Sequence, residues 1–85
     1  MTRTEAIRTA LDSAFSPSRL EVVDESERHR GHAGYQEGGE SHFRVVIRAP
    51  AFAGQSRLAR HRAVHEALGP DLVSSIHALS LDIDA

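Results

Sequence analysis

The sequence contains no cysteine, so the chain forms no disulfide and offers no thiolate of its own to a metal. Its apolar runs are only a few residues long, far short of the ~20 residues that span a bilayer. The opening stretch, M-T-R-T-E-A-I-R, lacks the apolar segment of a secretory signal. These absences argue against a disulfide-rich secreted domain and against a membrane protein. We expect a cytoplasmic protein without a membrane partner.

The sequence also lacks the arrangements on which catalysis usually depends. No nucleophile beside a base and no pair of carboxylates stands out. A chain of 85 residues is enough for one domain and not two. It buries about 60–70% of its unfolded surface, which leaves room for a modest core and not for an elaborate enclosed site. We therefore expect a single domain over residues 1–85 that is not an enzyme.

Lysine is absent as well, and all ten basic residues are arginine. Five of these arginines, and no acidic residue, fall within residues 41–65, although the net charge of the protein is −2. The middle of the chain is therefore a basic block on a mildly acidic protein. Arginine binds carboxylates and phosphates through two parallel hydrogen bonds, but genomic base composition explains an arginine-only chain equally well.

The first predicted element is a helix over residues 3–15. Thr2 and Glu5 have the spacing of a capping box, which satisfies amide groups of the first helical turn. Apolar residues then recur at helical spacing. Ser16 precedes Pro17, and the residue before a proline is disfavoured in the helical region, so the helix ends there.

Two strands are predicted next, over residues 20–24 and 41–49. The second alternates clearly, with Phe43 and Ile47 on one side and Arg44 on the other. The segment between the strands is rich in glycine and charge and has no periodicity, which predicts a long loop. We expect the two strands to form an antiparallel hairpin.

The C-terminal half predicts a second helix, a short further turn and a third strand. Gly69 and Pro70 end the helix, which starts near residue 56, and residues 76–84 alternate as a strand. The helix residues expected to be buried are Leu58, Val64, Ala67 and Leu68. The order helix, strand, strand, helix, turn, strand predicts an α+β fold, with a three-stranded sheet and the helices packed on one face.

The six histidines are the residues with the most possible functional roles. In the third strand, His77 is in phase with Leu79 and begins the side that faces the helices, which predicts a histidine at the rim of the core. His42 alternates with Phe43, so we expect it to be solvated or to face a partner. His29 and His32 fall in the loop.

His61 and His65 lie four residues apart on the second helix, a spacing found in helical zinc sites. A zinc site needs three or four ligands, and this helix offers no obvious third one. We expect a packed or hydrogen-bonded His61 and a His65 at the surface or at an interface. Residues 31–34 match the GxxG pattern of KH domains by coincidence, because that pattern must join two helices and here it joins two strands.

Four stretches together resemble the BolA family: L-E-V-V-D-E-S (20–26), E-S-H-F-R-V-V-I (40–47), F-A-G-Q-S-R-L-A-R-H-R-A-V-H-E-A-L (52–68) and I-H-A-L-S-L (76–81). They occur in the family's order and at its spacings, and the resemblance covers nearly the whole chain. It implies a fold similar to a class II KH domain, α-β-β-α-(α)-β. This order agrees with the elements predicted above.

The resemblance also implies a function. Proteins of this family pair with monothiol glutaredoxins and share a 2Fe–2S cluster with them, in cluster trafficking and iron homeostasis. The resemblance implies His77 as one ligand and His29 as the other, with His32 as the alternative because the loop varies in length. The partner would supply a cysteine thiolate and glutathione a second one, so we expect no cofactor in the isolated chain. Two imidazoles opposite two thiolates is a Rieske-like division, which raises the reduction potential.

A second function is implied by family members described as transcriptional regulators of stress and morphology. A KH-like shape and the basic block favour a DNA-binding surface. The negative net charge argues against it, and the same side chains could bind glutathione or an acidic partner. The residues expected on this surface are Arg44, Arg48, Arg57, Arg60, Arg62 and His65.

Overall fold

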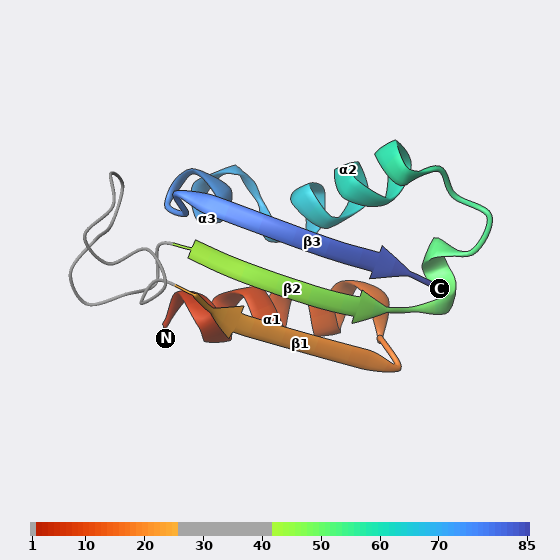
Figure 1. The fold of residues 1–85 in the computed structure, drawn as a ribbon, viewed down its shortest axis with the longest axis horizontal. Helices are drawn as coiled ribbons and strands as arrows, with labels where there is room; N and C mark the ends of the chain where they lie inside the picture. Colours follow the sequence, from red (N-terminus) through yellow and green to blue (C-terminus); the bar gives the residue numbers. More distant parts are fainter. Residues whose placement is uncertain (1, 26–41) are drawn as a thin grey trace.

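The computed structural model describes residues 2–25 and 42–85, and its elements follow the predicted order (Figure 1). This order, with a three-stranded mixed sheet, confirms the α+β fold. The elements are α1 (Arg3–Phe15), β1 (Arg19–Asp24), β2 (His42–Arg48), a short 3-10 helix (Pro50–Phe52), α2 (Arg57–Leu68), α3 (Pro70–Ser74) and β3 (Ala78–Asp84).

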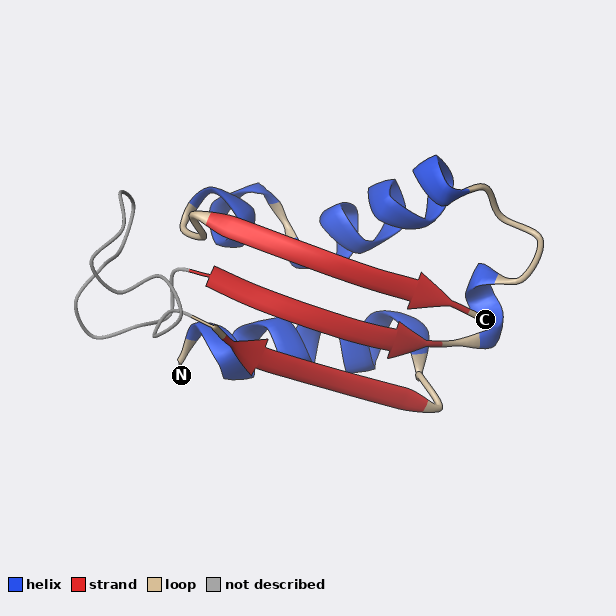
Figure 2. Ribbon diagram, in the orientation of Figure 1, coloured by secondary structure: helices blue, strands red, loops and turns tan. Residues whose placement is uncertain are grey.

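The sheet has the strand order β1-β2-β3, so the middle strand is also the second in sequence. β1 pairs antiparallel with β2, as the predicted hairpin requires, with Leu20 opposite Ile47. β2 pairs parallel with β3, with His42 opposite Ala78. The connection from β2 to β3 contains α2 and α3, as a parallel pair of strands needs. The helices lie on one side of the sheet (Figure 2).

The helix ends are fixed by capping residues, of which the sequence predicts Thr2 and Gly69 but not Ser56. The hydroxyl of Thr2 accepts a hydrogen bond from the Glu5 amide (3.1 Å), and the hydroxyl of Ser56 accepts one from the Ala59 amide (3.1 Å). α2 stops at Gly69, whose φ of +85° lies in the region that favours glycine. Pro70 then begins α3.

The hydrophobic core lies between the sheet and the helices. β2 contributes the side of the strand that the alternation predicted, including Phe43, which is 2% exposed. The Phe15 and Phe52 rings lie 4.7 Å apart between centroids and close one end of the core. The buried apolar residues of the described chain are Ile7, Leu11, Val22, Phe43, Val45, Val46, Ile47, Ala49, Phe52, Val64 and Leu68.

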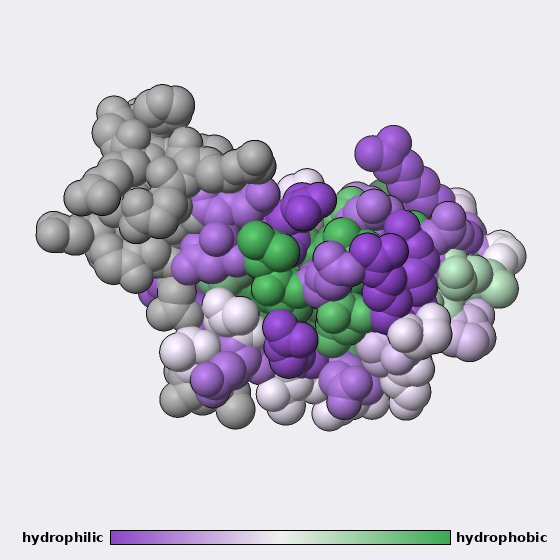
Figure 3. All heavy atoms as spheres, turned by 60° about the horizontal axis from the view of Figure 1, so that its bottom comes forward, coloured by the Kyte–Doolittle hydropathy of each residue, from purple (hydrophilic) through white to green (hydrophobic). Residues whose placement is uncertain are grey.

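Leu58 was expected in this core, and that prediction is wrong, because its side chain is 60% exposed. Residues of a helix are separated by about 100°, so Leu58 lies about 120° around α2 from Val64. The residue that points towards the sheet from this turn is Arg60, and Arg60 is half-buried. Among the described residues only Val23 and Leu58 are exposed large apolar residues. The face drawn in Figure 3 is accordingly mostly hydrophilic, with an apolar area near its middle.

The start of the third strand also differs from the prediction. β3 begins at Ala78, so His77 lies in a bend just before the strand and is exposed. It is not the first core-facing residue of the strand. Leu79, Leu81 and Ile83 do pack against the core, as predicted. The alternation that begins at Leu79 therefore does not extend back to His77.

Candidate functional site

His77 lies against a second histidine, His42, at one end of the sheet. The centroids of the two imidazole rings are 4.9 Å apart, and the ring planes are inclined by 55°. The parallel register places His42 opposite Ala78, the residue that follows His77. Two histidines distant in the sequence are therefore neighbours at the N-terminal ends of β2 and β3.

The two imidazoles differ in exposure. His42 is 4% exposed, whereas His77 is exposed. The prediction of a solvated or partner-facing His42 is therefore wrong. Strand alternation does place His42 out of phase with Phe43, but it cannot show that the ring of His77 lies against His42. No local pattern in the sequence signals this contact.

A shallow depression of about 290 Å³ opens beside the histidine pair. The Glu25 amide donates a 2.7 Å hydrogen bond to the His42 carbonyl oxygen and fixes the start of β2. The Glu25 carboxylate lies 3.7 Å from Nε of Arg44 and is mostly buried. The depression is lined by Glu25, His42, Phe43, Ala78, Leu79 and Ser80.

The loop histidines of the sequence analysis, His29 and His32, lie outside the described residues, as do residues 31–34 with the GxxG pattern. The residues on either side of that segment are described. Asp24, the last residue of β1, pairs with Phe43, and β2 begins at His42. Both ends of the segment are therefore attached at the end of the sheet where His77 lies.

Within residues 2–25 and 42–85, no three His, Asp or Glu side chains gather closely enough to hold a metal ion. The helical pair His61 and His65 makes a local contact instead. Nδ1 of the exposed His65 donates to the His61 carbonyl oxygen at 2.8 Å. His61 is half-buried. His77 can therefore belong only to a metal site that other groups complete.

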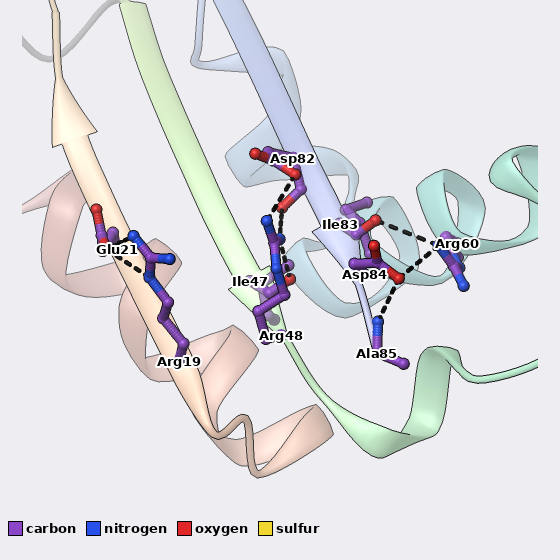
Figure 4. Close-up of polar contacts among 9 residues, drawn as sticks. All are labelled: Arg19, Glu21, Ile47, Arg48, Arg60, Asp82, Ile83, Asp84 and Ala85. Carbon is purple, nitrogen blue, oxygen red and sulfur yellow. Dashed lines mark hydrogen bonds and ion pairs between the residues drawn. The ribbon is translucent and has the colours of Figure 1, made fainter.

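The arginines of the basic block divide into two groups, and Arg60 belongs to the group that holds the fold together (Figure 4). Its Nε donates to the Phe52 carbonyl oxygen at 3.0 Å. Its Nη1 lies 3.4 Å from the carbonyl oxygen of Ile83 and 3.3 Å from the carboxylate of Asp84. Arg60 thus joins α2 to the end of β3 and to the turn after β2.

Arg48 has a similar role between the two parallel strands. Its Nη1 donates to the carbonyl oxygens of Ile47 (3.0 Å) and Asp82 (3.1 Å), and its Nη2 lies 3.1 Å from the Asp82 carboxylate (Figure 4). Arg44 pairs with Glu25, as described above. Four of the six residues predicted for a partner surface thus make polar contacts within the chain, namely Arg44, Arg48, Arg60 and His65.

Arg57 and Arg62 form the second group. Both are exposed on α2, and neither has an ion pair or side-chain hydrogen bond to the rest of the described chain. Arg57 lies beside the exposed Leu58. It also borders an open depression of about 320 Å³ between α2 and β3, which is lined by Arg57, Arg60, His61, Leu81, Asp82 and Ile83.

At the C-terminal end of β3, opposite to the end where His77 lies, the carboxyl group of Asp84 has a shifted pKa. The pKa of Asp84 is held below its usual value of 3.8, first because the Ala85 amide donates a 2.8 Å hydrogen bond to it and then because Arg60 lies beside it. Arg48 adds a smaller effect in the same direction. The charged form of Asp84 is therefore the form that the fold stabilises.

No helix in the described part of the chain is both long and apolar enough to cross a membrane.

Comparison with known proteins gives a consistent result. The sequence profile of the BolA-like protein family matches residues 11–85. An uncharacterized Sinorhizobium protein from the cobS 5' region is 51% identical over 83 residues, which are 96% of this chain and 89% of that protein. The DNA-binding transcriptional regulator BolA of Escherichia coli (strain K12) is 46% identical over 77 residues, covering 91% of this chain and 70% of the regulator.

The solved structures agree with this result. The BolA domain of SufE1 from Arabidopsis thaliana matches the fold with a TM-score of 0.82 and 38% identity, covering 99% of this chain and 92% of that domain. None of these three relatives carries the name of an enzyme.

Proposed function

Because the chain belongs to the BolA family, we propose that it binds a monothiol glutaredoxin and shares a labile 2Fe–2S cluster with it. In this proposal the chain is a single-domain accessory protein of the cytoplasm, without catalytic activity, and the cluster is its cargo in iron–sulfur trafficking and iron homeostasis. The observation that carries the proposal is the position of His77. Its imidazole is exposed at the end of the sheet to which the segment with His29 and His32 is attached.

The donor groups of the chain fit a shared cluster. A protein without cysteine cannot supply the four thiolates of the usual site, so the remaining ligands must come from elsewhere. An exposed imidazole in the bend just before a paired strand can enter a site that closes only when a partner docks. In the proposal His77 and either His29 or His32 bind one iron, and a glutaredoxin cysteine and glutathione bind the other. The cluster would supply redox-active iron with a raised potential.

The test of this proposal is a reconstitution. The chain is mixed with a monothiol glutaredoxin, glutathione and a source of iron and sulfide, and visible absorption and circular dichroism are recorded. We expect a heterodimer whose spectrum differs from that of the glutaredoxin homodimer. His77→Ala should abolish the difference and leave the far-UV spectrum unchanged, because His77 is exposed.

Controls make the assignment specific. Thr9→Ala changes an exposed residue of α1 and should leave the spectrum of the complex as it is. Of His29→Ala and His32→Ala, one should alter the spectrum and thereby identify the loop ligand. A His77→Ala sample with the wild-type spectrum would refute the role of His77.

A second function, DNA binding, is favoured by one specific observation. α2 presents Arg57 and Arg62 without partners in the described chain, and a relative with 46% identity is named a DNA-binding transcriptional regulator. In this alternative the protein regulates transcription in the response to stress. Each phosphate contact adds to affinity and makes it depend on salt.

Retention on immobilised DNA at low salt tests the alternative. Arg57→Ala and Arg62→Ala should each weaken retention and lower its salt dependence, whereas Arg8→Ala, an exposed arginine of α1, should not. No retention of the wild type at low salt would exclude this function, since the phosphate contribution is strongest there.

A further inference from the structure

We infer that His42 is a positioning residue that holds the imidazole of His77 in the orientation in which it meets the partner's cargo. The inference rests on the proposed function and adds a residue to which the family resemblance assigned no role. It begins from the ring contact of 4.9 Å between a buried histidine and an exposed one. In such a pair the buried ring is held in place by its surroundings, and the exposed ring rests on it and can contact a partner.

The backbone of His42 is well fixed. His42 begins β2, which is paired on both sides, with β1 and with β3. Its carbonyl oxygen accepts the 2.7 Å hydrogen bond from the Glu25 amide. Its side chain is 4% exposed and has an interaction within the chain besides the ring contact. The His42 ring is therefore a rigid surface against which another ring can rest.

His77 needs such a surface. It lies in a bend before β3 and belongs to no strand pair, so the ladder does not fix its backbone. An exposed side chain with free torsions loses conformational entropy when it is fixed in a binding site. The strand position opposite His42 is Ala78, so His77 directly precedes the residue that pairs with His42, and its ring lies against the His42 ring. Contact with His42 thus restricts the His77 ring before any partner arrives.

The expected effect follows from the strength of ring contacts. Aromatic pairs contribute an amount that corresponds to about a 2- to 10-fold change in an equilibrium constant. Without the His42 ring, the His77 side chain should sample several rotamers and the affinity for cluster-loaded glutaredoxin should fall by about 2- to 10-fold. The ligand set would be unchanged, so the visible spectrum of the complex should remain that of the wild type.

Two variants separate positioning from other roles. His42→Ala removes the ring, and His42→Phe keeps a ring but has no nitrogen. In NMR spectra of the free chain with labelled histidine, wild type and His42→Phe should show His77 with one rotamer and a ring-current shift. His42→Ala should show an averaged rotamer and lose that shift. Far-UV spectra and urea midpoints establish that each variant is folded before it is compared.

The affinity titration with glutaredoxin, glutathione and cluster completes the experiment. His42→Phe should bind about as tightly as the wild type, and His42→Ala about 2- to 10-fold more weakly. Unchanged rotamers of His77 in His42→Ala would overturn the inference, and so would a changed cluster spectrum in His42→Phe, which would make the His42 nitrogen a ligand. If the wild type forms no cluster complex, the proposed function fails, while the NMR result on the free chain still decides whether His42 orients His77.

Discussion

Replacing Arg60 by methionine tests whether the basic block contains a structural arginine. The variant keeps most of the aliphatic stem, so the packing of α2 on the sheet is largely retained, and it removes three polar contacts. The arginine side chain is 21% exposed, whereas that of Asp84 is 63% exposed. The three contacts therefore differ in strength.

The hydrogen bond to the Phe52 carbonyl oxygen is the shortest of the three at 3.0 Å, and a hydrogen bond from a charged donor contributes about 1.5–3 kcal/mol. The contact with Ile83 is long at 3.4 Å and adds little. The pair with the exposed Asp84 adds little, because solvent screens it. The hydrogen bond to Phe52 therefore dominates, and Arg60→Met should lower the free energy of unfolding by about 2 kcal/mol.

Urea unfolding followed by far-UV circular dichroism measures this loss. With an m-value of about 1 kcal/mol/M, the midpoint should fall by about 2 M. Arg57→Met is the matched control, because Arg57 is exposed and without a partner in the described chain, and it should change stability by less than about 0.5 kcal/mol. Equal midpoints for the two variants would refute the division of the block into structural and exposed arginines.

Three further predictions concern the same fold. The pKa of Asp84 is lowered in the folded state, so the charged carboxylate contributes to stability at a pH above 3.8, its usual pKa. This contribution is lost as the pH falls through the lower pKa of the folded state, so Asp84→Asn should flatten the dependence of Tm on pH in this acidic range. Leu11→Ala should cost about 2–5 kcal/mol because Leu11 is 0% exposed, whereas Leu58→Ala should cost less than about 0.5 kcal/mol, and similar losses in urea would contradict the observed burial. Gly69→Ala should cost about 1 kcal/mol by calorimetry, through backbone strain alone, since a Cβ there meets no atom within 4 Å.

Much of the fold was predictable because its signals are local. The Thr2 cap and the proline at residue 17 define α1 to the residue, and alternation identifies the core side of β2. The prediction for Leu58 is wrong because an apolar residue is buried only if its angle around the helix points it to the core, and that of Leu58 does not. Arg60 occupies the inward position with a long side chain whose polar end reaches backbone carbonyl oxygens.

The candidate site was harder to predict. The exposure of His77 depends on where β3 begins. The alternating pattern predicts a strand from residue 76, whereas β3 begins two residues later, at Ala78. The contact with His42 depends on the parallel register of β2 and β3, which no short-range pattern contains. The family resemblance named His77, yet only the register identifies the histidine beside it.

The parallel pairing of β2 with β3 also fixes when the histidine pair can form. Each β2–β3 pair joins residues that are far apart in the chain, with two helices between them, and closing such a loop costs conformational entropy that local pairs avoid. During synthesis the hairpin of β1 and β2 can form while β3 is still inside the ribosome. The contact between His42 and His77 must wait until α2, α3 and β3 have followed. The histidine pair is therefore assembled later than the hairpin of β1 and β2, and it depends on the completed parallel pairing of β2 with β3.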